Sequence, residues 1–253
     1  MEQLEPMPSR FEGFPGLMQG GYLAGVAAGP EPGPTRVQIH QPVRPGDRLG
    51  LEVLDGRRVL RSADGATVMV AFADRLEVED PLPIAASVVA EATTRPLPWD
   101  KPFPRCAGCG DRADGLGVDL RVATDEHSKG RIVGRWTPAE VDHRHVWTVV
   151  DCLTSWSLFV DPPADASGTY VTGNIALEIR RPLRAGVPYR LQAWRDRDLM
   201  PPETRFRLGS VIVGGAISDD EGLVAIADQE MVRTDQPGMT LAPGGGPGPV
   251  TTA

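Results

Sequence analysis

One helix followed by an antiparallel meander occurs twice in this chain, and this duplication constrains the fold more than any other feature. The segment HQPVRPGDRL (40–49) resembles RRPLRAGVPYRL (180–191), 140 positions later. DGATVMVAFAD (64–74) resembles EGLVAIAD (221–228) when small gaps are allowed. Solenoid repeats have periods of about 20–50 residues. A repeat of this length therefore indicates a duplicated domain.

Each half has its own helix and strands. In the first half, a helix is expected from Gly20 to about Ala28, and alternating apolar residues with Asp-Gly turns predict strands over 35–43, 47–54, 57–62 and 67–78. In the second half, apolar residues at helical spacing predict a helix over 146–160. A hairpin over 117–123 and 130–138 precedes this helix. Further strands follow it over 169–183, 188–196, 205–218 and 223–232.

Composition excludes several classes of protein. The 253 residues are 41% hydrophobic and carry a net charge of -8, which argues against a nucleic-acid surface. No run of about 18 apolar residues predicts a membrane-spanning helix, and the acidic N-terminus lacks the apolar region of a secretory signal. Three cysteines without a signal favour reduced thiols in the cytoplasm. The sequence predicts a first domain over 1–80 and a second over 105–235. A Pro-rich linker over 81–104, with a short helix at 85–92, joins them, and a disordered tail follows over 236–253.

Three segments resemble hotdog-fold acyl-CoA thioesterases. FPGLMQGGYLAG (14–25) is similar to the opening of their central helix, where His or Gln precedes Gly-Gly. RCAGCGDRADGLGVDL (105–120) is similar to a strand entry of thioesterase-superfamily proteins, and VWTVVDCLTSW (146–156) to a central helix that commonly carries Asp. The resemblance implies an α+β fold of two tandem hotdog domains, each a long antiparallel sheet wrapped around one central helix. The first half has too few residues before its helix for the hairpin of the second, so its sheet is expected to lack a strand or borrow an edge.

The candidate catalytic groups come from different halves. Thioester hydrolysis develops negative charge on the carbonyl oxygen, and the amides of Gly20 and Gly21 at a helix N-terminus can stabilise it. Asp151 lies in the middle of the second helix, where burying a carboxylate is costly. Burial raises the pKa of a carboxyl group toward that of a general base. Alternatively, Asp151 attacks the thioester as a nucleophile. The first helix has no acid and the second no Gly-Gly. In hotdog thioesterase dimers the helix start of one subunit meets the acid of the other, so the resemblance implies one composite site here, with substrate contacts from Gln19, Tyr22, Trp147, Thr148 and Ser155.

Structural roles compete with this interpretation. Gly20 and Gly21 are also explained by close packing, and Asp151 by bonds to Thr148, Thr154 or an arginine. A hotdog hydratase or dehydratase would need a His where Phe14 stands. A non-catalytic acyl-CoA or lipid-binding hotdog protein is a further alternative, because the first half lacks the acid and the second half lacks the Gly-Gly. The expected substrate is an acyl-CoA or an acyl-carrier protein, with CoA as part of the substrate, no cofactor or metal, no membrane insertion, and assembly of the pseudo-dimers into a homo-oligomer.

The histidines and cysteines near the second helix have simpler explanations. His143 and His145 stand just before it, and capping by Asp142 is favoured over a role in substrate binding. Cys106 and Cys109 form a lone C-x-x-C. A zinc site with Cys152 and these histidines, or a redox pair, is weighed against a tight glycine-rich turn entering a strand, and the turn is favoured.

Overall fold

The strands form a single antiparallel sheet that runs through both halves. The computed structural model describes residues 1–123, 130–160, 168–195, 210–235, 238–241 and 246–248. Within this part of the chain the sheet has twelve strands, in the order β1-β3-β4-β5-β2-β8-β11-β10-β9-β7-β6, with β12 paired to β8. The strands are β1 (Glu2–Gln3), β2 (Thr35–Ile39), β3 (Gly50–Leu54), β4 (Arg57–Arg61), β5 (Thr67–Ala73), β6 (Asp119–Val122), β7 (Ile132–Trp136), β8 (Gly168–Ile179), β9 (Tyr189–Trp194), β10 (Ser210–Asp219), β11 (Gly222–Thr234) and β12 (Met239–Leu241).

The two halves join where β2 pairs with β8. Thr35 lies opposite Leu177 and Gln38 opposite Asn174, so the short sheet of the first half continues directly into the second. The first half has the four predicted meander strands and the two-residue β1, which pairs with β3 at the free edge. The expectation of a short or borrowed edge is therefore met by sharing one sheet between the halves.

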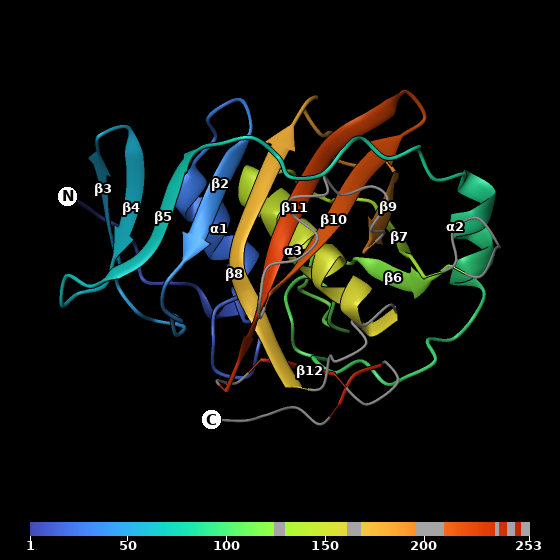
Figure 1. The fold of residues 1–253 in the computed structure, drawn as a ribbon, viewed down its shortest axis with the longest axis horizontal. Coiled ribbons are helices and arrows are strands. Elements are labelled where there is room, and N and C mark those ends of the chain that lie inside the picture. Colours follow the sequence, from blue (N-terminus) through green and yellow to red (C-terminus); the bar gives the residue numbers. More distant parts are fainter. Residues whose placement is uncertain (124–129, 161–167, 196–209, 236–237, 242–245, 249–253) are drawn as a thin grey trace.

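Two helices lie on the same face of this sheet (Figure 1). Helix α1 (Gly20–Ala28) packs on β2, β4 and β5, and α3 (His143–Val160) packs on β7 to β11. The helices also pack on one another and run in opposite directions, since Gly21 approaches Trp147 whereas Gly25 approaches Arg144. This contact between the helices places the start of α1 against the middle of α3.

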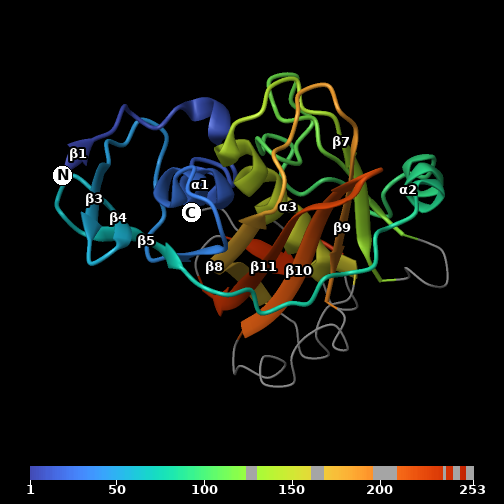
Figure 2. The same ribbon diagram turned by 90° about the horizontal axis from the view of Figure 1, so that it is seen from above.

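The linker crosses the opposite face of the sheet, away from α1 and α3 (Figure 2). Buried Arg36 pairs with Asp74 at 2.7 Å and with buried Asp228 at 2.8 Å, which ties the end of β5 to β11. Gln192 on β9 donates to the carbonyl of Leu82 at 3.0 Å. The predicted short helix is α2 (Ala86–Thr93), which packs on β6 and β7. A short 3-10 helix, η1 (Ser9–Phe11), precedes α1.

Some boundaries differ from the prediction. Strand β2 ends at Ile39 rather than 43, before Pro42, which has no amide for the ladder. Strand β5 ends at Ala73 rather than 78, because the chain leaves the sheet to enter the linker. The predicted disordered tail lies partly outside the described residues, but its Met239–Leu241 form β12 with Met239 and Leu241 buried, so disorder is wrong for these three residues. The segment 205–209, predicted as the start of a strand, also lies outside the described residues.

Candidate active site

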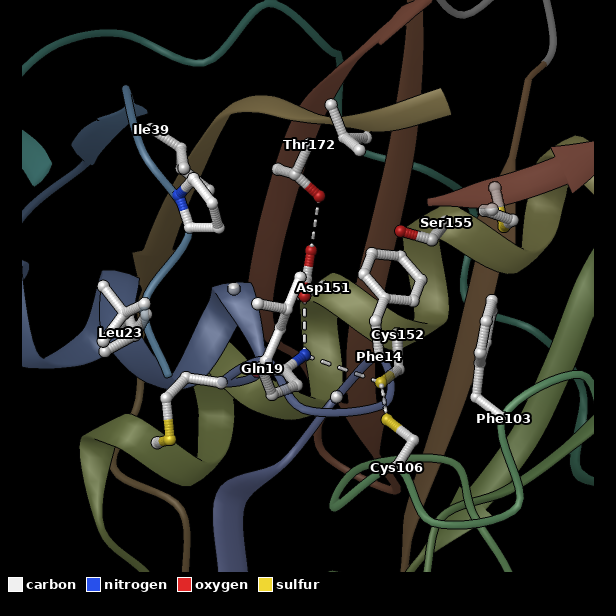
Figure 3. A pocket seen from close by; sticks show the side chains of 18 of the residues that line it. Phe14, Gln19, Leu23, Ile39, Phe103, Cys106, Asp151, Cys152, Ser155 and Thr172 are labelled. Carbon is white, nitrogen blue, oxygen red and sulfur yellow. Dashed lines mark hydrogen bonds between the residues drawn. The ribbon is translucent and has the colours of Figure 1, made fainter. Parts of the chain in front are cut away.

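A buried carboxylate joins the two halves of the molecule. Asp151 lies in the middle of α3 and is 8% exposed. Its Oδ2 accepts hydrogen bonds from the Gly21 amide at 3.0 Å and from Gln19 Nε2 at 2.6 Å. Its Oδ1 accepts from Thr172 Oγ1 at 2.9 Å and from Gln229 Nε2 at 2.8 Å. Figure 3 shows Asp151 between Thr172 and Gln19. The predicted approach of Asp151 to the start of the first helix is confirmed.

Burial sets the protonation of this acid. Desolvation raises the pKa of Asp151 to about 6, while the hydrogen bonds from Thr172 and from the Gly21 amide oppose the rise. A carboxyl with a pKa close to neutral is well matched to proton transfer near pH 7. The predicted rise of the pKa on burial is therefore present, and the role of Asp151 as a base stays a prediction.

Gln19 is fixed at the N-terminus of α1. Its Oε1 caps the helix by accepting from the Tyr22 amide at 2.6 Å, and its Nε2 donates to Asp151. Since Gln19 holds the Tyr22 amide and Asp151 holds the Gly21 amide, one amide of the first turn is left over. Among the described residues, the amide of Gly20 has no hydrogen-bond acceptor, and Gly20 lines the cavity described below.

The two glycines have different surroundings. A Cβ on Gly21 would lie 2.3 Å from the carbonyl oxygen of Trp147 and 2.6 Å from Cβ of Asp151, so only glycine lets α1 come this close to α3. A Cβ on Gly20 would lie no closer than 3.5 Å, from Oδ2 of Asp151. Close packing, weighed earlier as an alternative, thus accounts for the side chain missing at Gly21. Its amide still bonds directly to the acid.

A cavity of about 530 Å³ opens beside Asp151, and both halves contribute to it. Gln19, Gly20, Asp151 and Ser155 supply polar groups on its wall. The rest of the lining is mainly apolar and includes Phe14, Leu17, Met18, Leu23, Ile39, Val43, Met69, Phe103, Trp156, Val171, Met231 and Met239. Such a wall suits an apolar chain, with a few polar groups at one place.

Only part of the predicted substrate-binding set reaches this cavity. Gln19 and Ser155 line it, whereas Tyr22, Trp147 and Thr148 do not. The Tyr22 ring stacks on Phe11 with centroids 3.8 Å apart, and Trp147 is buried at the contact between the helices. Thr148 turns its hydroxyl back to the carbonyl of Arg144 within α3. These three side chains serve packing, because α1 directs Tyr22 and α3 directs Trp147 and Thr148 away from the cavity.

Sequence reasoning missed two partners of the acid. Thr172 lies on β8 and Gln229 on β11, and both side chains reach Asp151 from the face of the sheet on which α3 packs. Gln229 also donates to Thr172, and it is wholly buried. Gln229 stands between Asp228 and Glu230 in the strand sequence LVAIADQEMV (223–232), and the available signal was that its position alternates with theirs and so faces the helix side of the sheet.

The histidines predicted to precede the second helix lie in its first turn, since α3 begins at His143 rather than 146. Asp142 accepts from the Arg144 amide at 2.8 Å, so capping by Asp142 is confirmed. His143 contacts the carbonyl of Gly25 at 3.1 Å, and neither His143 nor His145 lines the cavity. The exposed His40 does line it, which places His40 at the rim.

Solved structures resemble the whole chain. No protein-family model and no curated protein matches it. The tesB protein of Mycobacterium avium subs paratuberculosis is 15% identical, with 92% of each chain covered and a TM-score of 0.56. A hot dog fold protein of Alicyclobacillus acidocaldarius is 13% identical, covering 93% of this chain and 94% of that one, with a TM-score of 0.54. The chain has a hotdog fold.

The hotdog fold of this chain confirms the predicted α+β class. A further structure, the acyl-CoA thioesterase II TesB2 of Mycobacterium marinum, is 14% identical over 92% of each chain, with a TM-score of 0.55. The likeness covers more than nine tenths of this chain, so it includes parts of both halves of the shared sheet. No helix in the described residues is long and apolar enough to cross a membrane.

Proposed function

We propose that this protein hydrolyses an acyl thioester of CoA at one composite site between its halves. The observation that carries the proposal is the buried Asp151, bonded to the start of α1 and facing a largely apolar cavity. The structural neighbours named as a tesB protein and as an acyl-CoA thioesterase II support the same reaction. The apolar wall would receive the acyl chain, with the thioester beside Asp151.

Asp151 acts in this proposal as the general base that takes a proton from water. Four donors already fill the roughly four acceptor positions of its carboxylate. A water therefore reaches Oδ1 only when one donor gives way, and Thr172 is suited to this because its hydroxyl can rotate in place. Thr172 would then bond the water, while Gln229 keeps the carboxylate oriented.

The Gly20 amide supplies the complementary positive pole. It lines the cavity at the N-terminus of α1, where the helix dipole favours negative charge. A thioester carbonyl placed on this amide would develop its negative charge against a fixed donor. The water then adds to the carbonyl carbon, and the CoA thiolate leaves as the carbonyl re-forms.

A panel of substrates tests the proposal. Purified protein is incubated with saturated acyl-CoAs of increasing length, with an acyl-carrier protein and with an enoyl-CoA, and the products are separated by chromatography. We expect free CoA and a fatty acid from at least one acyl-CoA. Acyl-CoA binding without release of CoA would support a non-catalytic binder, and addition of water to the enoyl-CoA would support a hydratase; either result overturns the proposal.

Hydrolysis of the acyl-carrier protein but of no acyl-CoA would mean that the substrate is carrier-bound, and it would overturn the choice of CoA. Location in the cytoplasm and assembly of the pseudo-dimers into a larger oligomer remain predictions.

A further inference from the structure

Three cysteines from distant parts of the sequence meet in the wall of the cavity. Cys106 and Cys109 lie in the turn that precedes β6, and Cys152 follows Asp151 in α3. They are the only cysteines of the chain, all three are buried, and their sulfur atoms lie within 4.8 Å of one another. The sulfurs of Cys106 and Cys152 are 3.5 Å apart and face each other in Figure 3.

This spacing matches a metal–thiolate site. With zinc–sulfur bonds of about 2.3 Å in tetrahedral geometry, two sulfur ligands are about 3.8 Å apart. The three sulfurs thus need only small movements to surround one ion. A disulfide would join two of them at about 2.05 Å and leave the third sulfur unexplained.

Each sulfur also faces N–H groups. Trp156 Nε1 donates to the sulfur of Cys109 at 3.3 Å, and Gln19 Nε2 lies 3.6 Å from the sulfur of Cys152. The backbone amides of Gly108 and Cys109 donate to Cys106. Thiolates coordinated to metals are held by such outer donors, which orient them and offset their negative charge. Three buried neutral thiols would not require this set of donors.

The turn is built to bring its sulfurs onto α3. A Cβ on Gly108 would lie 2.5 Å from the sulfur of Cys152, so a side chain there would push the turn away from the helix. A Cβ on Gly110 would lie 2.5 Å from the carbonyl oxygens of both Pro104 and Cys106. The expected glycine-rich turn is present, and its glycines serve the approach of the three cysteines.

We propose that Cys106, Cys109 and Cys152 bind one thiophilic cation of the Zn²⁺ type as three thiolates. All three residues line the cavity, so the fourth coordination position would face the space proposed for the substrate. A site with three protein ligands keeps this position open for water or another ligand. On binding, the three sulfur–metal bonds replace three S–H bonds and the protons pass to solvent.

This inference goes beyond the proposed hydrolysis, which needs no metal, and departs from the expectation of no metal site drawn from a lone C-x-x-C. The difference lies in Cys152, which the fold brings to the pair from 46 positions beyond Cys106. His143 and His145, weighed as ligands from the sequence, are not members of the cluster found among the described residues.

Metal titration of the reduced, chelator-treated full chain tests the site. We expect one Zn²⁺ per chain by elemental analysis, and Co²⁺ in its place should give sulfur-to-cobalt charge-transfer absorption. Cys106→Ser, Cys109→Ser and Cys152→Ser should each lose the tightly bound ion and this absorption. Absence of a bound ion in the wild type, or its retention without all three thiolates, would overturn the proposal whatever the hydrolytic activity.

Further variants separate this site from its neighbours. Trp156→Phe keeps a buried aromatic ring but removes the N–H donated to Cys109, and it should weaken Zn²⁺ binding about 10–100-fold. Ser155→Ala changes a cavity residue whose hydroxyl bonds Gln229 and Met231, and it should leave the affinity unchanged. Asp151→Asn should lower hydrolysis about 10²–10⁴-fold but keep the ion, so failure of either proposal is distinguishable from failure of the other. Equal Zn²⁺ affinity in wild type and Trp156→Phe would contradict the assigned thiolate at Cys109.

Discussion

The duplicated fold places a helix start against a facing helix at two points, and the two points are built differently. At the start of α1, Gly21 donates its amide to Asp151 and the cavity opens alongside. At the start of α3, Arg144 packs against Gly25 and pairs with Asp142. One point holds a buried carboxylate next to a cavity, and the other holds a capped, partly exposed ion pair.

This difference shows how a duplicated fold can divide its labour. Helix α1 has no acidic residue from Gly20 to Ala28, so the counterpart of Asp151 is missing. Helix α3 has no glycine at its start and uses Asp142 to satisfy its free amides. Under the proposed function the first point carries the chemistry, while the second has groups that fix a helix. The variants below test whether this division is real.

The largest effect is expected from Asp151→Asn. The variant keeps the size of the side chain but cannot accept a proton, so thioester hydrolysis should fall about 10²–10⁴-fold. The matched control is Asp142→Asn at the other helix start, where Asn caps as well as Asp. Steady-state release of CoA from the best acyl-CoA measures both. Equal loss in the two variants, or no loss in Asp151→Asn, would contradict the division.

Gly21→Ala and Gly25→Ala probe the same helix contact at two places. Their Cβ atoms would lie 2.3 Å from the Trp147 carbonyl oxygen and 2.7 Å from Cα of Arg144. Each substitution should therefore lower the free energy of unfolding by about 1–3 kcal/mol, measured by chemical denaturation. Only Gly21→Ala should also slow hydrolysis per folded molecule, because its amide holds Asp151. An equal loss of activity in both would show that the glycines act through packing alone.

Thr172→Val removes the hydroxyl that bonds Oδ1 of Asp151. We expect kcat to fall about tenfold with little change in KM, since a hydrogen bond to a charged group contributes about 1.5 kcal/mol or more. Thr169→Val is the control, because Thr169 lies on the same strand but its hydroxyl bonds Thr240 at 3.1 Å. A rise in KM alone would instead make Thr172 a substrate-binding residue.

The sequence predicted those features that depend on local pattern. Periodicity located the helix over 146–160 and the meander strands. The resemblance to hotdog thioesterases, together with the complementary absences of acid and Gly-Gly, led to the contact between Gly21 and Asp151. Strand ends were less accurate, since the end of β5 depends on where the linker leaves the sheet. Likewise, β12 forms because β8 extends far enough to pair with it.

The sequence did not predict contacts between the second helix and residues on distant strands or turns. Thr172 and Gln229 lie 21 and 78 positions from Asp151, and no spacing rule connects strands in one sheet to a helix residue. Tyr22 and Trp147 were misassigned because a helical pattern gives a residue's face but not which neighbour covers it. Cys152 joins Cys106 for a similar reason, since the turn that carries Cys106 has no periodicity to orient it.

The smallest effect is expected from Asp142→Ala, which tests the second helix start. Hydrogen bonding to Arg144 lowers the pKa of Asp142 to about 2, against an ordinary value of 3.8. The carboxylate therefore stabilises the fold above pH 4, and this contribution is lost as the pH falls through about 2. At pH 7, Asp142→Ala should lower the free energy of unfolding by about 1 kcal/mol. The difference from wild type should shrink between pH 4 and pH 2 in denaturation curves, while hydrolysis per folded molecule stays unchanged at pH 7. A difference that is constant with pH would mean that Asp142 acts without its charge, and a loss of hydrolysis would extend the chemistry to both helix starts.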